Sequence, residues 1–185
     1  MLHTFVVHVE DKPGVLARVA SLFRRRAFNI DSLTVGRTEK PGVSRMTIVV
    51  DTDEHGALRL EAHLYKLINV LLIEDVTATP AVYRELAMIR VTADHAQRSH
   101  IMELVRVFRA KVVDVSPDSL GIEITGTEDK IDGLLEVLRP FGILEMTRTG
   151  RVAIRRGAKS AAAAAAGAET GEEDEPVPGS ISFSV

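Results

Sequence analysis

The residues best suited to chemistry lie in a five-residue segment, Glu10-Asp11-Lys12-Pro13-Gly14. A β-branched run precedes this segment and apolar residues at helical spacing follow it, so we expect it to connect a strand to the start of a helix. The first N–H groups of a helix lack helical partners and carry partial positive charge, and a glycine lets an anion approach the backbone. A small carboxylate therefore suits this loop. From the residues alone, Pro13-Gly14 can equally be a pair that only starts a helix, which is the more common reason for it.

Two polar residues, one in this segment and one after the predicted helix, have two interpretations each. Asp11 is either a solvated loop acid or a counter-charge for an ammonium group. Asn29 is either a turn residue between a helix and a strand or a hydrogen-bonding residue that serves both ends of a zwitterion. Together with the loop, they would suit a free amino acid.

The sequence contains few residues or motifs that would support catalysis. It contains no cysteine, which excludes disulfides, thiolate nucleophiles and thiolate metal sites. The six histidines show no spacing typical of a helix-borne metal site, and no metalloprotease, hydrolase, Walker or dinucleotide-binding motif is present. Paired acids occur only at the expected ends of elements, where solvated turns explain them. We therefore expect no catalytic residue and no metal site in this chain.

Composition and charge argue against nucleic acid and membranes as binding partners. The 185 residues are 45% hydrophobic and carry a formal net charge of -3, so no global field attracts the chain to nucleic acid or to an anionic membrane. No apolar run approaches the ~20 residues that span a bilayer, and the first residues lack the basic and apolar regions of a leader. We expect a cytoplasmic protein that contacts neither a membrane nor nucleic acid.

The elements that must position the loop alternate between strand and helix periods. The patterns predict a strand over Phe5–Val9 and then a helix face of Leu16, Val19, Leu22 and Phe23. A hairpin of Ile30–Thr38 and Met46–Val50 follows. A second helix face (Leu60, Leu64, Leu67, Ile68 and Leu71) and a last strand, Ile73–Val76, complete the unit. This β-α-β-β-α-β order is the ferredoxin-like motif, so the fold class is α+β. RNA-recognition domains share it, but the central strand Arg45–Val50 lacks the stacking aromatics that they use.

The same order recurs after Thr79-Pro80. The patterns are Leu86–Ala93; Ile101, Leu104, Val105 and Phe108; Val112–Val115 with Ile122–Ile124; Ile131, Leu134, Leu135 and Leu138; Ile143–Ile154. At an offset of 85, Leu16, Val19, Leu22, Phe23 and Ile30 match Ile101, Leu104, Val107, Phe108 and Val115. Pro13-Gly14 has no counterpart in this copy. We therefore predict a first ferredoxin-like domain over residues 1–79, a second over 80–157, and a disordered low-complexity tail over 158–185.

Two sets of residues carry a resemblance to a known family. The stretch Glu10–Leu16 followed by Asn29-Ile30 resembles the effector loop of ACT domains, ferredoxin-like modules that bind amino acids and regulate metabolic enzymes. The segments Phe28–Gly36, Ser44–Val50 and His63–Leu67, with Phe108–Ala110 and Val113–Val115, resemble the small regulatory subunit of acetohydroxyacid (acetolactate) synthase in particular. This similarity covers residues 2–157.

The resemblance implies a function in branched-chain amino acid biosynthesis. Members of that family form homodimers without an active site, stimulate a catalytic subunit that uses thiamine diphosphate, Mg²⁺ and FAD, and confer feedback inhibition by valine. Carried onto matching positions, it implies an effector site between two N-terminal domains: Asp11, Gly14, Val15 and Leu16 from one chain, Asn29 and Ile30 from the other. Many members have asparagine at the position of Asp11. The aspartate of this chain therefore adds a negative charge beside the zwitterion.

Two rival functions remain at this point. The chain could be a free-standing ACT sensor that controls another enzyme, in which case it would not purify with a thiamine diphosphate enzyme. It could also be an independent enzyme, in which case the isolated chain would turn over pyruvate.

Overall fold

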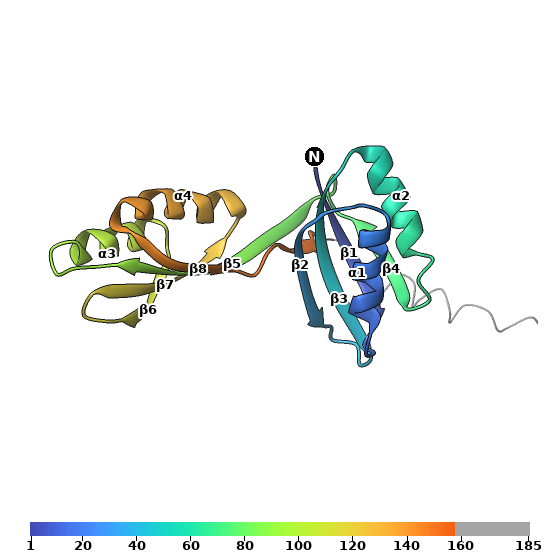
Figure 1. Ribbon diagram of the computed structural model, residues 1–185, viewed down its shortest axis with the longest axis horizontal. Coiled ribbons are helices and arrows are strands. Elements are labelled where there is room, and N and C mark those ends of the chain that lie inside the picture. Colours follow the sequence, from blue (N-terminus) through green and yellow to red (C-terminus); the bar gives the residue numbers. More distant parts are fainter. Residues whose placement is uncertain (158–185) are drawn as a thin grey trace, which may run out of the picture.

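The first sheet forms from β-branched and aromatic residues at alternate positions. In the computed structural model, which describes residues 1–157, strands β1 (Leu2–Glu10), β2 (Ile30–Arg37), β3 (Val43–Asp51) and β4 (Val70–Asp75) form an antiparallel sheet in the order β2-β3-β1-β4. Helices α1 (Val15–Arg25) and α2 (Glu54–Leu64) cover one face of it (Figure 1). We call this unit the first domain. The predicted ferredoxin-like motif is confirmed.

Register places the core of this domain on the helix side of the sheet. Phe5 pairs with Ile48 and Val7 with Met46, and all four side chains are buried under the helices. Val6 points to the opposite face, because neighbouring strand residues face opposite ways. Both faces of β1 are therefore buried.

The second domain repeats the arrangement. Strands β5 (Ala81–Thr92), β6 (Lys111–Val115), β7 (Ser119–Gly126) and β8 (Ile143–Arg148) form the order β6-β7-β5-β8, with α3 (Arg98–Val107) and α4 (Glu128–Leu138) on one face. A 3₁₀ helix, η1 (Arg139–Phe141), follows α4, and a last strand, β9 (Val152–Arg155), pairs with the start of β5. The expectation of a second ferredoxin-like unit is also confirmed.

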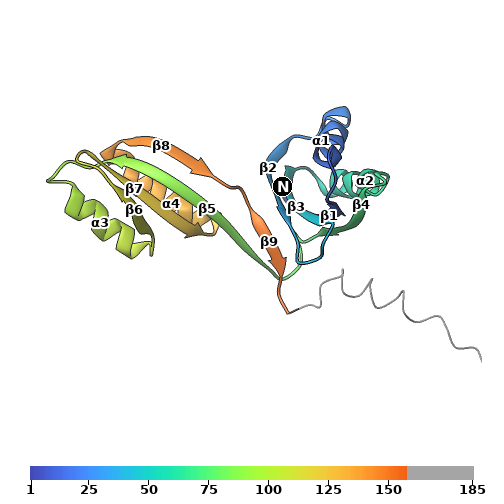
Figure 2. The ribbon, with the colours of Figure 1, turned by 90° about the horizontal axis from the view of Figure 1, so that it is seen from below.

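Strands β5 and β9 form a two-stranded ribbon that returns to the first domain (Figure 2). The ribbon packs on the sheet face that α1 and α2 leave open, where Val6, Val76 and Ala153 are buried together with Ala81 and Tyr83 at the margin. The two domains thus share a small apolar core. The proposed division at residues 79 and 80 stays a prediction, since the ribbon lies beyond it in sequence but packs on the first domain.

Three predicted core positions are wrong. In α1 the buried residue of the first turn is Val15, whereas Leu16 is 44% exposed. Helix α2 ends at Leu64, so Ile68 and Leu71 lie beyond it and are 88% and 51% exposed. The helical spacing continued by chance into the turn and into β4.

The predicted last strand, Ile143–Ile154, is two strands. Thr149, Gly150 and Arg151 separate β8 from β9, and Gly150 has a φ of 80° that ends the extended run. Each half pairs with a different stretch of β5.

The predicted offset of 85 between the copies is also wrong for the first helices. It matches buried Leu22 with Val107, which is 75% exposed. Burial instead aligns Val15 and Val19 with Ile101 and Val105, an offset of 86.

The prediction of a disordered tail concerns residues 158–185, which lie outside the described residues. Within residues 1–157, no helix has both the length and the apolar character to cross a membrane.

Candidate functional site

Helix α1 begins at a glycine with left-handed backbone conformation. Gly14 is the N-cap, with φ 83°, and it supplies no side chain to bond the first N–H groups. The N–H of Val15 donates to the Lys12 carbonyl at 3.3 Å, and the first helical bond runs from the N–H of Arg18 to the Gly14 carbonyl at 3.0 Å. The N–H groups of Leu16 and Ala17 therefore have no helical carbonyl to bind. With no acid in the first turn, this helix start is suited to bind an anion.

Gly14 is required by its backbone and leaves open space in front of it. A Cβ atom added there would have no other atom within 4 Å. A positive φ is costly for most other residues, so the conformation explains the glycine. The sequence interpretation, in which the glycine allows a ligand to approach, is compatible with this open space.

Asp11 is held beside the helix start by the β2–β3 hairpin. Its N–H donates to the Gly42 carbonyl at 2.8 Å, and its Oδ1 accepts from the Ser44 hydroxyl at 3.1 Å. Its Oδ2 lies 3.3 Å from Nε of Arg37, whose side chain is 87% exposed. An exposed ion pair of this kind is weak, so a ligand ammonium group could replace Arg37.

A brace of polar side chains fixes the other side of the loop. Asn69 donates to the Glu10 carboxylate, and Arg18 donates to the Asn69 side-chain oxygen at 2.5 Å. The hydrogen bond from Asn69, with a second from Lys12, lowers the pKa of Glu10 below its usual value. The brace ties β1 and α1 to the residue before β4, which holds the loop at the end of the sheet.

The two halves of the predicted site do not meet within one chain. Gly14 precedes the first residue of α1, while Asn29 and Ile30 follow its last turn (Figure 1). Helix α1 has 11 residues, and at about 1.5 Å per residue its two ends are roughly 16 Å apart. One amino acid could not contact both ends.

The four remaining side chains differ in accessibility. Val15 is 4% exposed and packs in the core, so it can support a ligand only from beneath, whereas Leu16 is 44% exposed beside it. Asn29 is exposed, and Ile30 is partly buried against the core. A second chain could therefore reach Leu16, Asn29 and the edge of Ile30.

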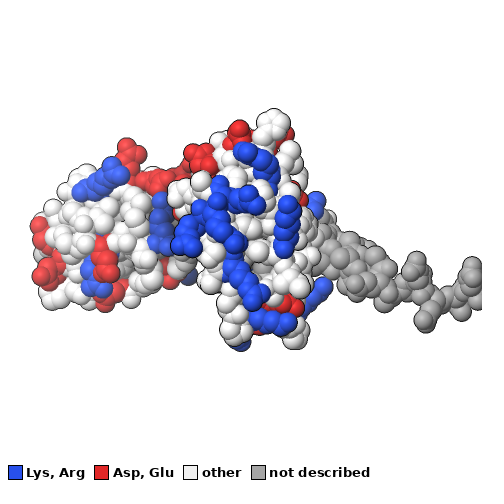
Figure 3. Space-filling model, turned by 45° about the vertical axis from the view of Figure 1, so that its right-hand side comes forward, with Lys and Arg blue, Asp and Glu red and all other residues white. Residues whose placement is uncertain are grey.

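Basic side chains gather over the first domain, as Figure 3 shows. Arg24, Arg25 and Arg26 are exposed at the C-terminal end of α1, three to five residues before Asn29. Positive charge at a helix C-terminus stabilises the helix. Their exposure to solvent agrees with this structural role.

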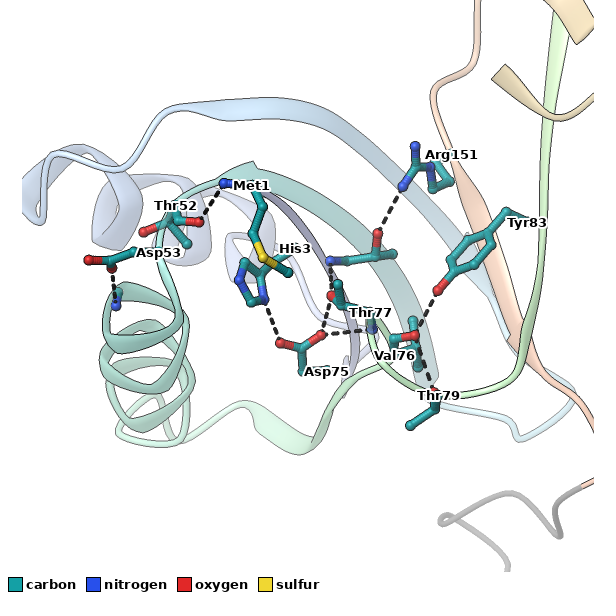
Figure 4. A network of polar contacts seen from close by, with 12 residues as sticks. Met1, His3, Thr52, Asp53, Asp75, Val76, Thr77, Thr79, Tyr83 and Arg151 are labelled. Carbon is teal, nitrogen blue, oxygen red and sulfur yellow. Dashed lines mark hydrogen bonds and ion pairs between the residues drawn. The ribbon is translucent and has the colours of Figure 1, made fainter. Parts of the chain in front are cut away.

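A histidine–carboxylate pair in the first domain has a structural role. His3 Nδ1 lies 2.9 Å from Asp75 Oδ2, but the His3 side chain is only 6% exposed (Figure 4). Burial raises the pKa of Asp75, and hydrogen bonds from Thr77 and His3 outweigh burial, so the net pKa is lowered. Because His3 is buried, the pair fixes the end of β4 against β1.

Comparison with known proteins decides the family. A family model described as small subunit of acetolactate synthase matches residues 84–157, and one described as an AHAS small subunit-like ACT domain matches residues 5–72. An acetolactate synthase small subunit of Mycolicibacterium smegmatis is 53% identical over 162 residues, 88% of this chain and 95% of that protein. The chain belongs to the acetolactate synthase small-subunit family.

Further relatives agree. A small subunit of Mycobacterium bovis is 53% identical over 155 residues, 84% of this chain and 92% of that protein. The crystal structure of the acetolactate synthase small subunit from Thermotoga maritima matches with a TM-score of 0.80 and 39% identity, over 86% of this chain and 99% of that one.

Membership confirms the main functional prediction. The chain is a regulatory subunit of acetolactate synthase, it carries an ACT domain, and its partner is a catalytic large subunit. The six proposed effector residues stay a prediction. Sequence reasoning missed Ser44, Asn69 and Arg37, which position the loop from the hairpin and from the residue before β4, because polar residues at such places carry no distinctive pattern.

Proposed function

We propose that the chain activates the catalytic subunit of acetolactate synthase and inhibits it when valine binds between two copies of the first domain. The observation that carries this proposal is the separation of the two half-sites by the length of α1. A site built from Asp11, Gly14 and Asn29 needs two chains, so the effector would also report on, and stabilise, a homodimer.

The edge of the first sheet provides a way to bring the half-sites together. Strand β2 is the outer strand, and within the chain it pairs only with β3 among the described residues. If two β2 strands paired antiparallel about a two-fold axis, the start of one strand would lie beside the end of the other. The end of β2 is where Arg37 contacts Asp11. Asn29 and Ile30 of one chain would then face the Asp11–Gly14 loop of the other.

The chemistry of this composite site fits valine. Its carboxylate would bind the free N–H groups of Leu16 and Ala17 at the start of α1. Its ammonium group would lie between Asp11 and the amide oxygen of Asn29. Its isopropyl group would contact Ile30 and Leu16, with Val15 beneath.

We assign thiamine diphosphate, Mg²⁺ and FAD to the catalytic subunit. Within residues 1–157, no three His, Asp or Glu side chains converge in a way that could hold a metal ion. In this proposal the catalytic subunit holds the cofactors, and this chain binds the partner and the effector.

The direct test is acetolactate formation by the cognate catalytic subunit, measured with and without this chain over a range of valine concentrations. We expect the chain to raise the rate and valine to reverse the increase. Unchanged activity on adding the chain would contradict the role of activator. Activation that does not respond to valine would contradict the role of valine sensor.

A further inference from the structure

Three residues between β8 and β9 join the second domain to the face of the first sheet that α1 and α2 leave open. The Thr34 hydroxyl donates to the Thr149 carbonyl at 3.1 Å, and the Arg151 N–H lies 3.4 Å from the Ser32 hydroxyl. Both partners belong to β2, the strand that begins at the proposed effector residue Ile30. We call residues 149–151 the joint.

The joint fits closely against β2 at Gly150. A Cβ atom added to Gly150 would lie 2.8 Å from Cβ and 3.2 Å from Oγ of Ser32, and the φ of Gly150 is +80°. Glycine is needed here because of its positive φ and because the joint and β2 of the same chain approach each other closely. A movement of Ser32 towards the joint would therefore displace Gly150 directly.

Arg151 connects both domains through one side chain. Its Nη1 donates to the Thr4 hydroxyl of β1 at 3.3 Å (Figure 4). Its Nη2 donates to Oε2 of Glu128 at 2.6 Å. Glu128 is the first residue of α4, in the second domain. The guanidinium carbon also lies 5.3 Å from the centre of the Tyr83 ring on the ribbon. The Arg151 side chain is only 20% exposed, and the one guanidinium group contacts β1, the ribbon and α4 together.

A β-bulge links the joint to the effector end of β2. Ile30 pairs with Val50 and Ser32 with Val49, so Asp31 is the extra residue. Without the bulge Ile30 and Ser32 would share a face, but here Ile30 packs under the helices and Ser32 faces the joint. A ligand that shifts Asn29 and Ile30 would rotate this bulge and so displace Ser32.

The second domain has room to respond. A polar cleft of about 480 Å³ lies between the domains, lined by residues of β2, β3, β5, α4, β8 and the joint, among them Asp31, Glu85 and Arg148. Open space beside a hinge permits rigid-body rotation without the cost of breaking a packed core.

From this geometry we propose that Arg151, set in the joint, is a positioning residue that converts occupancy of the effector site into a change in the orientation of the second domain. This inference rests on the proposed function, since it requires an effector at Asn29 and Ile30. It assigns to Ser32, Gly150 and Arg151 the step between sensing and the catalytic partner.

The test separates binding from response. In Arg151→Ala, valine binding to the regulatory dimer, measured by calorimetry, should stay within about threefold of the parent. Stimulation of the catalytic subunit should persist, while the valine concentration for half inhibition should rise at least tenfold or inhibition should become incomplete. Arg155→Ala is the matched control, because Arg155 lies on β9, directly after the joint, and pairs with Glu74 of the first domain at 3.0 Å without reaching α4. It should behave as the parent.

A distance measurement tests the movement itself. The chain has no cysteine, so Leu58→Cys on α2 and Val107→Cys on α3, which are 60% and 75% exposed, accept one spin label each. Labelled chain diluted with unlabelled chain gives one distance per dimer. We expect valine to shift this distance in the parent and in Arg155→Ala, but not in Arg151→Ala.

Three outcomes are distinguishable. If the parent does not bind valine, the proposed function is wrong and the joint has no effector signal to transmit. If Arg151→Ala binds valine and is inhibited like the parent, or shows the parental change in distance, only the inference about the joint is wrong. If Arg151→Ala loses valine binding and inhibition together, Arg151 supports the effector site and does not transmit its occupancy, which also overturns the inference.

Discussion

Replacing Gly14 by aspartate should abolish the valine response while preserving activation. The new carboxylate would stand at the start of α1, where we place the carboxylate of the effector. Two like charges about 4 Å apart, at an effective dielectric constant of about 20, repel by about 4 kcal/mol. Even if rearrangement removes half of this energy, about 2 kcal/mol remains, which weakens binding about 30-fold.

The fold should tolerate this change. The added Cβ meets no atom within 4 Å, so the cost comes from the φ of +83°. A non-glycine residue in the left-handed region costs about 1–2 kcal/mol, and aspartate is among the residues that adopt it more readily. An acid near a helix N-terminus returns about 0.3–1 kcal/mol. A net loss near 1 kcal/mol lowers the melting temperature of a chain of this size by only about 2–4 °C.

Gly14→Asn is the matched control, because asparagine has the same shape as aspartate and tolerates the same backbone conformation without the charge. The two variants should melt within about 4 °C of each other, while only Gly14→Asp should lose most of its valine affinity. The assay is acetolactate formation by the variant holoenzymes across a valine titration. Inhibition of Gly14→Asp at the parental valine concentration would show that the effector does not bind at this helix start. Loss of stimulation would show that sensing and activation cannot be separated here.

Two further predictions concern the tail and the response to acid. Deletion of residues 158–185 should leave activation and valine inhibition unchanged, since the family match ends at residue 157; a loss of stimulation by the shortened chain would contradict this. Burial, and then the charge of Arg45, lower the pKa of His8 below 6.5, so the unfolded state takes up a proton first and stability should decline as pH falls below 6.5 towards the lower folded value. His8→Gln should flatten the free energy of unfolding over that window, measured by denaturant titration, and an unchanged slope would exclude His8 as the cause.

The order of the elements along the chain and the loop between β1 and α1 were predictable because they depend on local signals. Alternating β-branched residues and the Pro-Gly pair mark β1, its end and the start of α1 within a few residues of one another. The phase of α1 was not predictable to one residue. Val15 and Leu16 are both apolar, and only packing decides that Val15 is buried and that Leu16 is exposed. That choice matters for the site, because it leaves Leu16 free to contact a ligand.

The need for a second chain followed from the family resemblance and not from the pattern of residues. Asn29 and Gly14 are 15 positions apart, a separation that a turn could have closed. Helix α1 instead fills the interval and keeps the two residues apart. This separation is the physical reason for proposing a two-chain site, and the spacing in the sequence alone could not give it.

The joint is where sequence reasoning failed with most consequence. The run from Ile143 to Ile154 contains enough β-branched and apolar residues to suggest one strand, yet a glycine inside a strand pattern often marks a bulge or a close approach of two backbones. Gly150 is such a position, but its partner Ser32 is more than one hundred residues away and belongs to the other domain. No local pattern encodes that contact. If residues 149–151 transmit the effector signal, the step that distinguishes a regulator from a simple binding domain depends on a tertiary contact that the periodicity of the sequence does not record.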